Sequence, residues 1–347
     1  MDVSVVIVDW HQPELTRRAL ESVLSQRVDA AVEVVLVVND ADDATVRAYR
    51  SDFPSIVVVP EPTNAGFAGG VARGIDASTG EVVVLVNNDA VADHGFLDRG
   101  LAALAAGGAE TAAVAATAVL EGRFVRVESG APRSDDDLVA ADGRRWRRVP
   151  TGGVTLVNGT GVVLDRSGNG RDRDWLRPID DAPEVAPLFG FSGGAAFLRR
   201  SAVAAVGGFD ESLFMYYEDL DLAWRLRLAG YRIGSAPDAV VVHRHAASSG
   251  SDSPLVRSQS MRNRLVVTAR DASDAMVARV LARTAVRLVR DLVRPSRAQL
   301  PPSAWWRLVR EAPAALRRAR HLRRRDGWSA ADRRRVEALF DGADRSR

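Results

Sequence analysis

Uninterrupted runs of apolar residues, rich in valine, alternate with segments of helical spacing over the first third of this 347-residue chain. The apolar runs occupy residues 3–8, 32–38 and 82–86, and a shorter run at 56–59 ends at Pro60. Because they lack polar alternation, these runs predict strands that are buried on both faces, as in a parallel sheet. Segments of helical spacing fill the gaps at residues 14–24, 44–49 and 67–77. We therefore expect an α/β fold with a doubly wound, mostly parallel sheet, whose ligands bind beyond the carboxyl ends of its strands.

The pattern changes in the middle of the chain. Between residues 121 and 190, clusters of Gly, Asp and Arg separate short Val-rich pieces, which predicts irregular connections and edge strands. Regular patterns then return, with a short strand expected at 195–198 and a helix at 220–229. A further strand is expected at 239–242 and ends at His243.

The C-terminal part, residues 255–347, predicts basic amphipathic helices. Between residues 275 and 294 arginines recur at spacings of three and four and form one stripe, while Val and Leu fall largely on other faces. The stripe consists of Arg279, Arg283, Arg287, Arg290 and Arg294. A second helical stretch at 305–325 adds two Trp to another arginine cluster. Three interpretations are open: docking on an anionic membrane surface, association with a partner or a second copy, and packing as a cap on the rest of the chain.

Composition supports a division into two parts. The chain has no Cys and no Lys, so all 47 of its basic residues are arginine. Disulfides, thiolate nucleophiles, cysteine metal sites, Schiff bases and P-loop lysines are thereby excluded. The net charge of +2 conceals an asymmetry, since residues 255–347 carry a net charge of +14 and residues 1–254 carry −12. We expect one domain at 1–254 and a basic helical extension at 255–347.

The same sequence predicts where the protein works. Its N-terminus lacks the basic region and the cleavage site of a signal peptide, and no run of about 18 apolar residues occurs. We therefore expect a cytoplasmic protein. The basic helices add peripheral attachment to the inner face of the cell membrane as an option.

Asp89 and His243 are candidates for metal binding. Asp89 follows directly after the apolar run at 82–86, and a carboxylate at the mouth of a sheet can hold a divalent cation that bridges two phosphates. The alternative is a turn residue that caps the next helix. His243 ends a Val-rich strand, and a neutral imidazole there could complete the coordination of such a cation. The alternative is a histidine that faces solvent at a strand end.

A cluster of acids, which includes Glu218 and Asp219, opens the helix expected at 220–229. Capping of the helix N-terminus by carboxylates is one interpretation. The aromatic residues that lead into the cluster, Phe214, Tyr216 and Tyr217, favour a pocket wall beside a general base that faces a sugar hydroxyl. Adjacent helix residues point about 100° apart, so the two acids cannot clamp one bond from both sides as a glycosidase requires. A reaction with a single base fits better.

Two glycine-rich segments, at 63–74 and 190–195, are candidates for close backbone approach to a ligand. The first lacks the G-x-G-x-x-G spacing of a dinucleotide-binding site. Its glycines still allow a phosphate to meet backbone amides at a helix start, with an arginine nearby. The residues concerned are Gly66 and Arg73 in the first segment and Gly193 and Gly194 in the second. Tight turns explain both segments equally well.

The order of these motifs resembles that of the family 2 glycosyltransferases of GT-A fold, in particular their bacterial rhamnosyltransferase-like branch. The matching segments are VVIVDWHQPELTRRALESVLSQ, VVLVVNDADD, PTNAGFAGGVARGI, GEVVVLVNNDA, GFSGGAAFLRR, VGGFDESLFMYYEDLDLAWRLRLAGYR and PDAVVVHRHAASSG. Together they span residues 5–250 in the family's order. The resemblance implies that residues 1–254 form a catalytic domain. Its reaction would be the transfer of a sugar from a nucleoside diphosphate sugar to an acceptor hydroxyl, with inversion at the anomeric carbon.

The resemblance also assigns roles to single residues. Asp89 takes the position of a carboxylate that binds Mg²⁺ or Mn²⁺, and His243 takes that of a further metal ligand. Asn87 stands where many relatives carry a first acid. Asp219, the second acid of its pair, looks like the catalytic base, with Glu218 as its neighbour and the alternative.

Contacts to the nucleotide sugar are expected at the strand ends and in the first glycine-rich segment. The residues are Asp9, Asn39, Asp40, Gly66, Arg73, Asn88 and Asp89. The family usually has Asp and then Asn where this chain has Asn39 and then Asp40, which is a departure at the position that reads the base. Gly193, Gly194, Tyr217 and Trp224 are expected to line the donor or acceptor pocket.

The resemblance leaves the substrates open. The donor is dTDP-rhamnose or another dTDP-, UDP- or GDP-sugar, and the acceptor is a glycan or a polyprenyl-linked glycan of the cell surface. Self-association is open, and nucleic acid is not expected as a partner. Two other classes of protein are alternatives. A sugar-1-phosphate nucleotidyltransferase should have an N-terminal glycine-rich loop, which residues 1–20 lack. A nucleic-acid binder is disfavoured by the acidic charge of residues 1–254.

Overall fold

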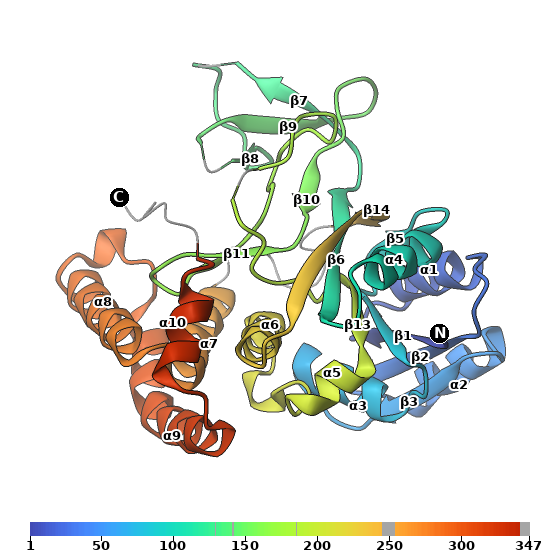
Figure 1. Ribbon diagram of the computed structural model, residues 1–347. Coiled ribbons are helices and arrows are strands. Elements are labelled where there is room, and N and C mark those ends of the chain that lie inside the picture. The colour runs from blue at the N-terminus through green and yellow to red at the C-terminus, as the bar shows by residue number, and fades with distance from the viewer. Residues whose placement is uncertain (129, 141, 185, 245–253, 341–347) are drawn as a thin grey trace.

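The computed structural model describes residues 1–128, 130–140, 142–184, 186–244 and 254–340 (Figure 1). Its centre is a mixed sheet of nine strands. These are β1 (Val3–Asp9), β2 (Val32–Asn39), β3 (Val57–Glu61), β4 (Val82–Val86), β5 (Ala90–Ala92), β6 (Thr111–Leu120), β10 (Val157–Gly159), β13 (Ala195–Arg199) and β14 (Arg232–His243). Their order is β3-β2-β1-β4-β13-β6-β14-β5, with β10 paired to β6 beside this path. The expected α/β class is confirmed.

The first four strands run parallel, as their apolar runs predict. β1 pairs with β2 and β4, and β2 pairs with β3. The helices of this half are α1 (Pro13–Leu24), α2 (Asp43–Asp52), α3 (Gly66–Asp76) and α4 (Phe96–Ala106). Every residue of β4 is buried, which accounts for its lack of polar alternation. β3 continues past the expected end at Pro60, and the sheet tolerates the proline because β3 is an edge strand.

The second half of the sheet contains a strand that the sequence pattern does not reveal. β6, with the sequence TAAVAATAVL, pairs antiparallel with β13 and parallel with β14. It is rich in Ala, which is depleted in strands, and nearly all of its residues are buried. β14 is longer than the strand expected at 239–242, because a register shift between Ala236 and Val240 interrupts its apolar pattern.

The middle region forms ordered β structure. β7 (Arg123–Val127), β8 (Leu138–Val139) and β9 (Arg145–Val149) make an antiparallel sheet that projects from the main sheet (Figure 1). Phe124 and Trp146 belong to its small core. β11 (Val162–Leu164) and β12 (Gly170–Asp172) form a hairpin. β11 is one of the Val-rich pieces for which the sequence predicts an edge strand, whereas the regular pairing of β7 with β9 differs from the expected irregular connections. The sequence does not reveal these two strands, because each buries one aromatic residue among arginines.

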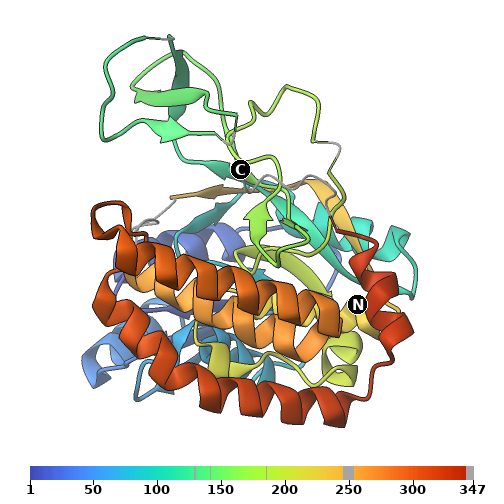
Figure 2. The same ribbon diagram turned by 90° about the vertical axis from the view of Figure 1, so that its left-hand side faces the viewer.

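The C-terminal helices lie beside α6 (Glu218–Leu228), which follows α5 (Arg200–Ala205) and the short 3-10 helix η1 (Glu211–Leu213). They are α7 (Pro254–Asp271), α8 (Asp274–Val293), α9 (Pro302–Asp326) and α10 (Ala330–Glu337), with the 3-10 helix η2 (Pro295–Arg297) before α9. Figures 1 and 2 show α7, α8 and α9 side by side. One apolar cluster joins Trp224 of α6 to Leu265 of α7 and to Phe340. The division at residue 254 stays a prediction, and a shared core crosses it.

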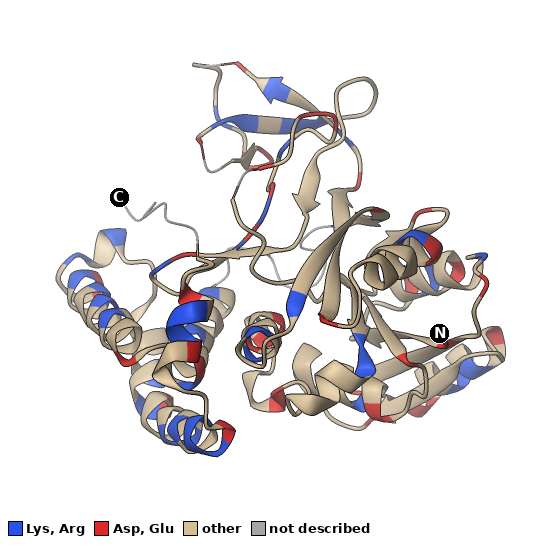
Figure 3. Cartoon of the chain, in the orientation of Figure 1, with Lys and Arg blue, Asp and Glu red and all other residues tan. Residues whose placement is uncertain are grey.

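Arginines are frequent on these helices (Figure 3). The arginine stripe predicted on α8 is not a wholly solvent-facing surface. Arg279 donates to the backbone carbonyl of Arg166, and Arg283 donates to the hydroxyl of Ser167, both in the turn between β11 and β12. The first half of the stripe therefore contacts the turn of this hairpin, as a packed cap requires. Within the described residues, no helix is long and apolar enough to cross a membrane.

Candidate active site at the mouth of the sheet

The topology of the sheet brings distant parts of the sequence to one place. The residues Asn87, Asn88 and Asp89 follow β4 directly. β13 runs antiparallel to β4 and pairs Ala195 with Val86, so the preceding glycine-rich segment lies beside the end of β4. β14 ends at His243, which pairs with Ala90 of β5. The mouth of the sheet is therefore built from β4, β13 and β14.

Asp89 and His243 are in direct contact. Asp89 Oδ1 lies 2.9 Å from His243 Nε2, and both side chains are largely buried, with 10% and 16% of their surface exposed. The other ring nitrogen, Nδ1, lies 3.1 Å from Asn158 Oδ1 of β10, which orients the ring. Asn87 Nδ2 lies 3.4 Å from Nε2. The sequence reasoning missed Asn158, because nothing in the pattern of the middle region marks it.

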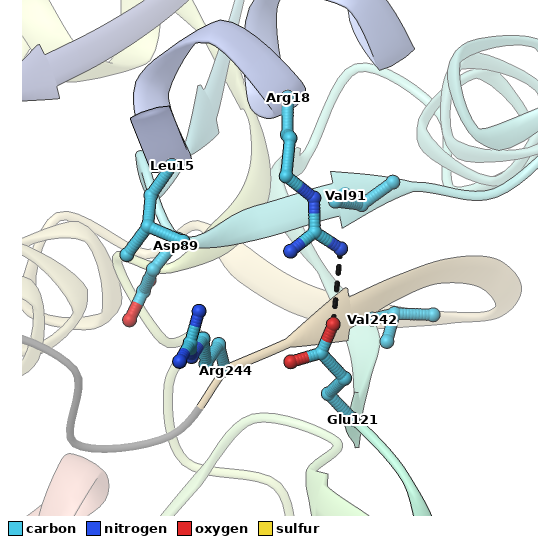
Figure 4. A pocket seen from close by; sticks show the side chains of 7 residues that line it. All are labelled: Leu15, Arg18, Asp89, Val91, Glu121, Val242 and Arg244. Carbon is cyan, nitrogen blue, oxygen red and sulfur yellow. Dashed lines mark hydrogen bonds and ion pairs between the residues drawn. The ribbon is translucent and has the colours of Figure 1, made fainter. Parts of the chain in front are cut away.

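A small hollow opens beside Asp89 (Figure 4). Two arginines line it, Arg18 of α1 and Arg244, which follows β14. The Arg18 guanidinium pairs with Glu121 at 2.9 Å, and the backbone amide of Arg244 donates to the carbonyl of Asp89 at 3.0 Å. The guanidinium of Arg244 points toward the side of the hollow where Asp89 lies (Figure 4). The hollow therefore carries two arginines and two carboxylates, those of Asp89 and Glu121.

Glu218 and Asp219 are the first two residues of α6 and differ in their surroundings. Glu218 is buried, and its Oε2 has no hydrogen-bond partner among the described residues. Asp219 is partly exposed, accepts from the Gly193 amide at 3.0 Å through Oδ2 and from the Leu220 amide at 2.7 Å through Oδ1. Burial raises the pKa of both carboxyls, and the raised pKa of Glu218 is also due to the negative charge of Asp219. Asp219 is the acid of the pair that a substrate can reach.

The segment with Gly193 and Gly194 joins the two ends of the site. Gly193 donates to Asp219, and the Asn87 amide donates to the carbonyl of Gly194 at 3.0 Å. A Cβ on Gly193 would lie 2.7 Å from the ring of Phe67, and one on Gly194 would lie 3.2 Å from Asn87. The structure thus places both glycines in the site, between the metal candidates and Asp219.

Asp172, at the end of β12, is a further carboxylate of this site that the sequence reasoning missed. Burial raises its pKa to about 6, with the charge of Asp219 adding to the effect and that of His243 opposing it. Both neighbours are thus within electrostatic range of one side chain, which supports a single site. Asp172 lies among several Asp and Arg residues of the middle region, where the sequence alone does not distinguish it.

The backbone before α6 has an unusual conformation. Phe214, Tyr216 and Tyr217 have positive φ angles of 61°, 67° and 72°. Such a conformation costs on the order of 1–3 kcal/mol for each residue that is not Gly. The Tyr217 hydroxyl donates to the carbonyl of Gly168 at 3.1 Å and accepts from the Gly170 amide at 3.2 Å. Tyr217 therefore ties this segment to the β11–β12 hairpin, which carries Asp172.

Trp224 requires a correction. It is 0% exposed, and its ring packs edge-on against Phe189 and Phe340. The expected pocket residue is a core residue instead. The reason is the position on α6, since Trp224 lies on the face that the C-terminal helices cover.

The expected nucleoside contacts lie at the ends of β1 and β2, and they differ in their surroundings. Asp9 is 1% exposed, and its oxygens accept from the Thr16 hydroxyl at 2.8 Å and the Tyr49 hydroxyl at 2.9 Å. Asn88 contacts the same carboxylate weakly, with Nδ2 at 3.4 Å. The hydrogen bonds of Asp9 favour a structural role at the end of β1, and its contact with a nucleotide stays a prediction.

Asn39 and Asp40 lie at the same edge, and Asn39 is 3% exposed. Asn39 Nδ2 donates to the Gly66 carbonyl at 2.9 Å, while its buried Oδ1 has no hydrogen-bond partner among the described residues. Asp40 is exposed and pairs with His11 Nε2 at 3.0 Å. Gly66 has a positive φ of 71°, and a Cβ there would lie 2.3 Å from the carbonyl oxygen of Phe214. Gly66 is thus required by the close approach of the segment before α6.

Arg73 lies on α3 and is already paired. Its guanidinium contacts Glu61 at 3.2 Å and Glu211 at 3.0 Å. These two carboxylates neutralise the charge that a phosphate would need. The predicted role of Arg73 in binding the nucleotide sugar stays a prediction, while the arginines beside Asp89 are closer to the metal candidates.

The fold and site define a class of protein, a glycosyltransferase of GT-A fold. The family model described as Glycosyl transferase family 2 matches residues 4–160, and the model described as Glycosyl transferase family group 2 matches residues 181–264. The chain is a family 2 glycosyltransferase of the rhamnosyltransferase-like branch, as its motifs suggest. The last part of the matching segment PDAVVVHRHAASSG, residues 245–250, lies outside the described residues.

One curated relative is similar to this chain in sequence, and two solved structures are similar to it in fold. The N-acetylglucosaminyl-diphospho-decaprenol L-rhamnosyltransferase of Mycobacterium tuberculosis H37Rv is 29% identical over 265 residues, which cover 72% of this chain and 79% of that protein. TarS 1–349 of S. aureus superposes with a TM-score of 0.51 at 17% identity, over 97% of this chain and 90% of that one. GalNAc-T7, crystallised with UDP, GalNAc and Mn²⁺, gives a TM-score of 0.56 at 14% identity over 80% of this chain. The match spans about half of that protein, 49% of its chain.

Proposed function

We propose that the protein transfers L-rhamnose from dTDP-rhamnose to a hydroxyl of a polyprenyl diphosphate-linked N-acetylglucosamine, with inversion at the anomeric carbon. The observation that carries this proposal is a connected site: Asp89 contacts His243, Asn87 joins His243 to Gly194, and Asp219 bonds to Gly193. The activity of the rhamnosyltransferase relative supports the choice of sugar and acceptor. Membership of family 2 favours glycosyl transfer over the rival nucleotidyl transfer.

Asp89 and His243 would hold the divalent cation, Mg²⁺ or Mn²⁺. Asp89 Oδ1 and His243 Nε2 lie 2.9 Å apart, so a carboxylate oxygen and an imidazole nitrogen would be the ligands of one cation. Asn158 Oδ1 accepts from Nδ1–H in the tautomer whose Nε2 lone pair would bind that cation. The bound ion supplies charge neutralisation to the departing diphosphate. One fold neighbour, GalNAc-T7, was crystallised with Mn²⁺, and the assignment here rests on the donor geometry.

Asp219 would act as the general base. Its carboxylate takes the proton of the acceptor hydroxyl while that oxygen forms a bond to the anomeric carbon, and the bond between this carbon and the diphosphate oxygen breaks. A single displacement of this kind inverts the anomeric centre. Glu218 is the weaker candidate, since burial and the charge of Asp219 favour its protonated form. Asp172 lies close enough to influence Asp219 and is a candidate contact for the acceptor.

Asn39 would contribute to recognition of the base. Its buried Oδ1 lacks a partner among the described residues, and a carbonyl oxygen is a hydrogen-bond acceptor. Thymine and uracil both carry an N–H group that such an acceptor can bind. Asn39 Nδ2 is already held by Gly66, which fixes the amide orientation. The departure from the family's usual Asp therefore preserves an acceptor at this position.

The exposed side of the C-terminal helices would meet the membrane that holds the acceptor. Several large apolar side chains are exposed on α8 and at the start of α9, among them Val286 at 68%, Val293 at 71% and Trp306 at 64%. Arg290 is exposed on the same helix as these valines, and Arg294 is exposed directly after it. Apolar side chains beside arginines suit the interface of an anionic bilayer. In this proposal the protein works as a peripheral enzyme at the inner face of the cell membrane.

Calorimetry with dTDP and Mn²⁺, followed by a turnover assay, tests the proposal. We expect dTDP to bind in the presence of Mn²⁺, and release of dTDP from dTDP-rhamnose to accelerate when a synthetic polyprenyl diphosphate N-acetylglucosamine is added. UDP-N-acetylglucosamine and GDP-mannose serve as comparison donors. Faster turnover of either of these would replace the proposed sugar, and no turnover of any of them would reject the proposed transfer.

A further inference from the structure

The segment 212–217 lies directly before Glu218 and Asp219. After the last two residues of η1 it has no regular secondary structure. Three of its last four residues have positive φ angles, a conformation that bulky side chains rarely adopt. Tyr217 is the N-cap of α6 and makes no side-chain capping hydrogen bond. The position of Asp219 depends on this segment, because the segment sets where α6 begins. Something outside it must hold its backbone in place.

Helix α7 supplies that support through one buried side chain. Asn263 is 0% exposed, and its Nδ2 lies within hydrogen-bond distance of three backbone carbonyls: Leu213 at 2.8 Å, Met215 at 3.0 Å and Tyr216 at 2.6 Å. The Asn263 Oδ1 accepts from Arg262 Nη1 at 2.8 Å, which orients the amide. An amide group with this contact set ties together the turns of the irregular segment.

Neighbouring residues of α7 reinforce the contact. Gln259 Nε2 donates to the Leu213 carbonyl at 2.9 Å, and Arg262 Nη1 donates to the Ser212 carbonyl at 3.2 Å. The opposite side of the segment is fixed by α3, since the Ala68 amide donates to the Phe214 carbonyl at 2.9 Å. The segment is thus held between a helix of the nucleotide-binding half and a helix of the C-terminal part.

The C-terminal helices also contact α6 further along its length. Arg270 of α7, which is 5% exposed at its side chain, lies 3.6 Å from Asp221 in the first turn of α6. At the other end of α6, Arg335 of α10 reaches the carbonyls of Arg227 at 3.4 Å and Leu228 at 3.2 Å. Figure 1 shows α6 between the sheet and these helices. The contacts with α6 therefore include both of its ends.

We infer that α7 supports the site from outside it through Asn263, which is a positioning residue for Asp219. This inference rests on the proposed function, because it takes Asp219 as the base. Asn263 touches no reacting atom in this arrangement. It acts by fixing the backbone from which Glu218 and Asp219 project, so that the carboxylate meets the acceptor hydroxyl at the required distance.

The test compares Asn263→Ala with Thr268→Val in the full chain. Thr268 is a matched control, since it is buried on the same helix and its hydroxyl bonds to the carbonyls of Arg264 and Leu265 in that helix. With dTDP-rhamnose, Mn²⁺ and the synthetic acceptor, Asn263→Ala is expected to lower kcat about 10- to 100-fold with the KM for the donor nearly unchanged. Thr268→Val is expected to keep kcat within about threefold.

Hydrogen exchange measures the positioning without any assay of turnover. Amides of residues 212–219 are expected to exchange at least tenfold faster in Asn263→Ala than in the wild type, and at the wild-type rate in Thr268→Val. If the wild type turns over no nucleotide sugar, the proposed function fails while the exchange result still decides whether Asn263 holds the segment. Unchanged exchange at 212–219, or a wild-type kcat in Asn263→Ala, overturns the inference.

A milder variant covers the case in which Asn263→Ala does not fold. Gln259→Leu removes one hydrogen bond to the same segment and a longer contact of 3.5 Å with Asn263 Oδ1, and it leaves the bonds from Asn263 Nδ2 to the segment in place. It is expected to lower kcat about three- to tenfold with the same unchanged KM, and to raise exchange at residues 212–219 to a smaller extent. A change in KM without a change in kcat, or wild-type values of both kcat and hydrogen exchange, would contradict a role of α7 in positioning the base.

Discussion

The two ends of the site are supported in different ways. At the end where we propose a metal, called the metal end, Asp89 and His243 follow β4 and β14, and the sheet brings them to 2.9 Å. At the end where we propose the base, called the base end, Asp219 follows a segment of irregular backbone that side chains of α7 hold. The metal end is held by regular backbone pairing between strands, while the base end depends on side chains of residues about 50 positions away along the chain.

This difference explains what each end can tolerate. A change at the metal end removes a ligand and leaves the sheet intact, so its effect should be confined to donor and cation. A change in the support of the base end moves Asp219 while the donor site stays formed. The following four predictions separate these effects, from the largest to the smallest.

Asp219→Asn is expected to have the largest effect. The substitution keeps the shape of the side chain and removes the group that accepts the proton, so kcat should fall by about 10²- to 10⁴-fold. The affinity for dTDP with Mn²⁺, measured by calorimetry, should remain within about threefold of the wild type. Glu218→Gln is the matched comparison and should lose far less, because burial already favours the protonated acid. A larger loss in Glu218→Gln than in Asp219→Asn would reverse the two roles.

The sequence allows the metal end to be predicted more fully than the base end. Asp89 and His243 end strands whose apolar runs are visible in the sequence, so both side chains can be placed at the mouth of the sheet in advance. The pair Glu218 and Asp219 can be found as well, from the start of an apolar helix. The residue that positions Asp219 cannot be predicted from the sequence. Asn263 lies in a helix that the sequence pattern does not mark, and it bonds to backbone carbonyls, which have no sequence signature.

Similar reasons explain the other differences. From the sequence alone, Trp224 looks like a pocket residue, because the sequence does not show that the C-terminal helices cover α6. Asp172 lies in a charged stretch whose hairpin becomes visible only in three dimensions. β6 is hidden by its alanines, although it is central to the sheet. In each case a long-range contact decides the role, and the local pattern carries no trace of it.

Asp89→Ala should have the second largest effect and leave the base end untouched. Loss of the carboxylate removes one expected cation ligand, and with it charge neutralisation worth several kcal/mol, so kcat/KM should fall on the order of 10²-fold. The diagnostic measurement is the ratio of dTDP affinities with and without Mn²⁺, which should approach one. Asp93→Ala, an exposed acid four residues further on, is the control. Metal-dependent affinity that survives in Asp89→Ala would place the cation elsewhere.

Asp172→Asn should raise stability while it lowers activity. In the folded protein the pKa of Asp172 is about 6, above the ordinary value of 3.8, so the folded state favours the protonated form. The stabilising contribution of this carboxyl is present below about pH 4 and is lost as the pH rises through about 6. At pH 7.5 the neutral amide should therefore raise the free energy of unfolding by on the order of 1–3 kcal/mol. The gain should vanish near pH 4.

Denaturant titrations of Asp172→Asn at pH 4 and pH 7.5 measure this effect, with the exposed Asp180→Asn as a control from the same region. We expect the loss of turnover to be about tenfold, since Asp172 influences Asp219 without replacing it. Equal stability changes at both pH values would show that the surroundings of Asp172 do not raise the pKa of its carboxyl. Wild-type turnover would remove Asp172 from the site.

The smallest effect is expected on the outer side of the C-terminal helices, whose inner side supports Asp219. Val289 is 59% exposed on α8, and glutamate there should weaken binding to vesicles of phosphatidylglycerol and phosphatidylcholine several-fold in a flotation assay. Val139→Glu, at a valine 41% exposed on the projecting sheet, is the matched control and should float like the wild type. Arg279→Gln should also float normally, because Arg279 donates to the turn between β11 and β12. Wild-type protein that stays with the soluble fraction would limit the role of these helices to their inner side.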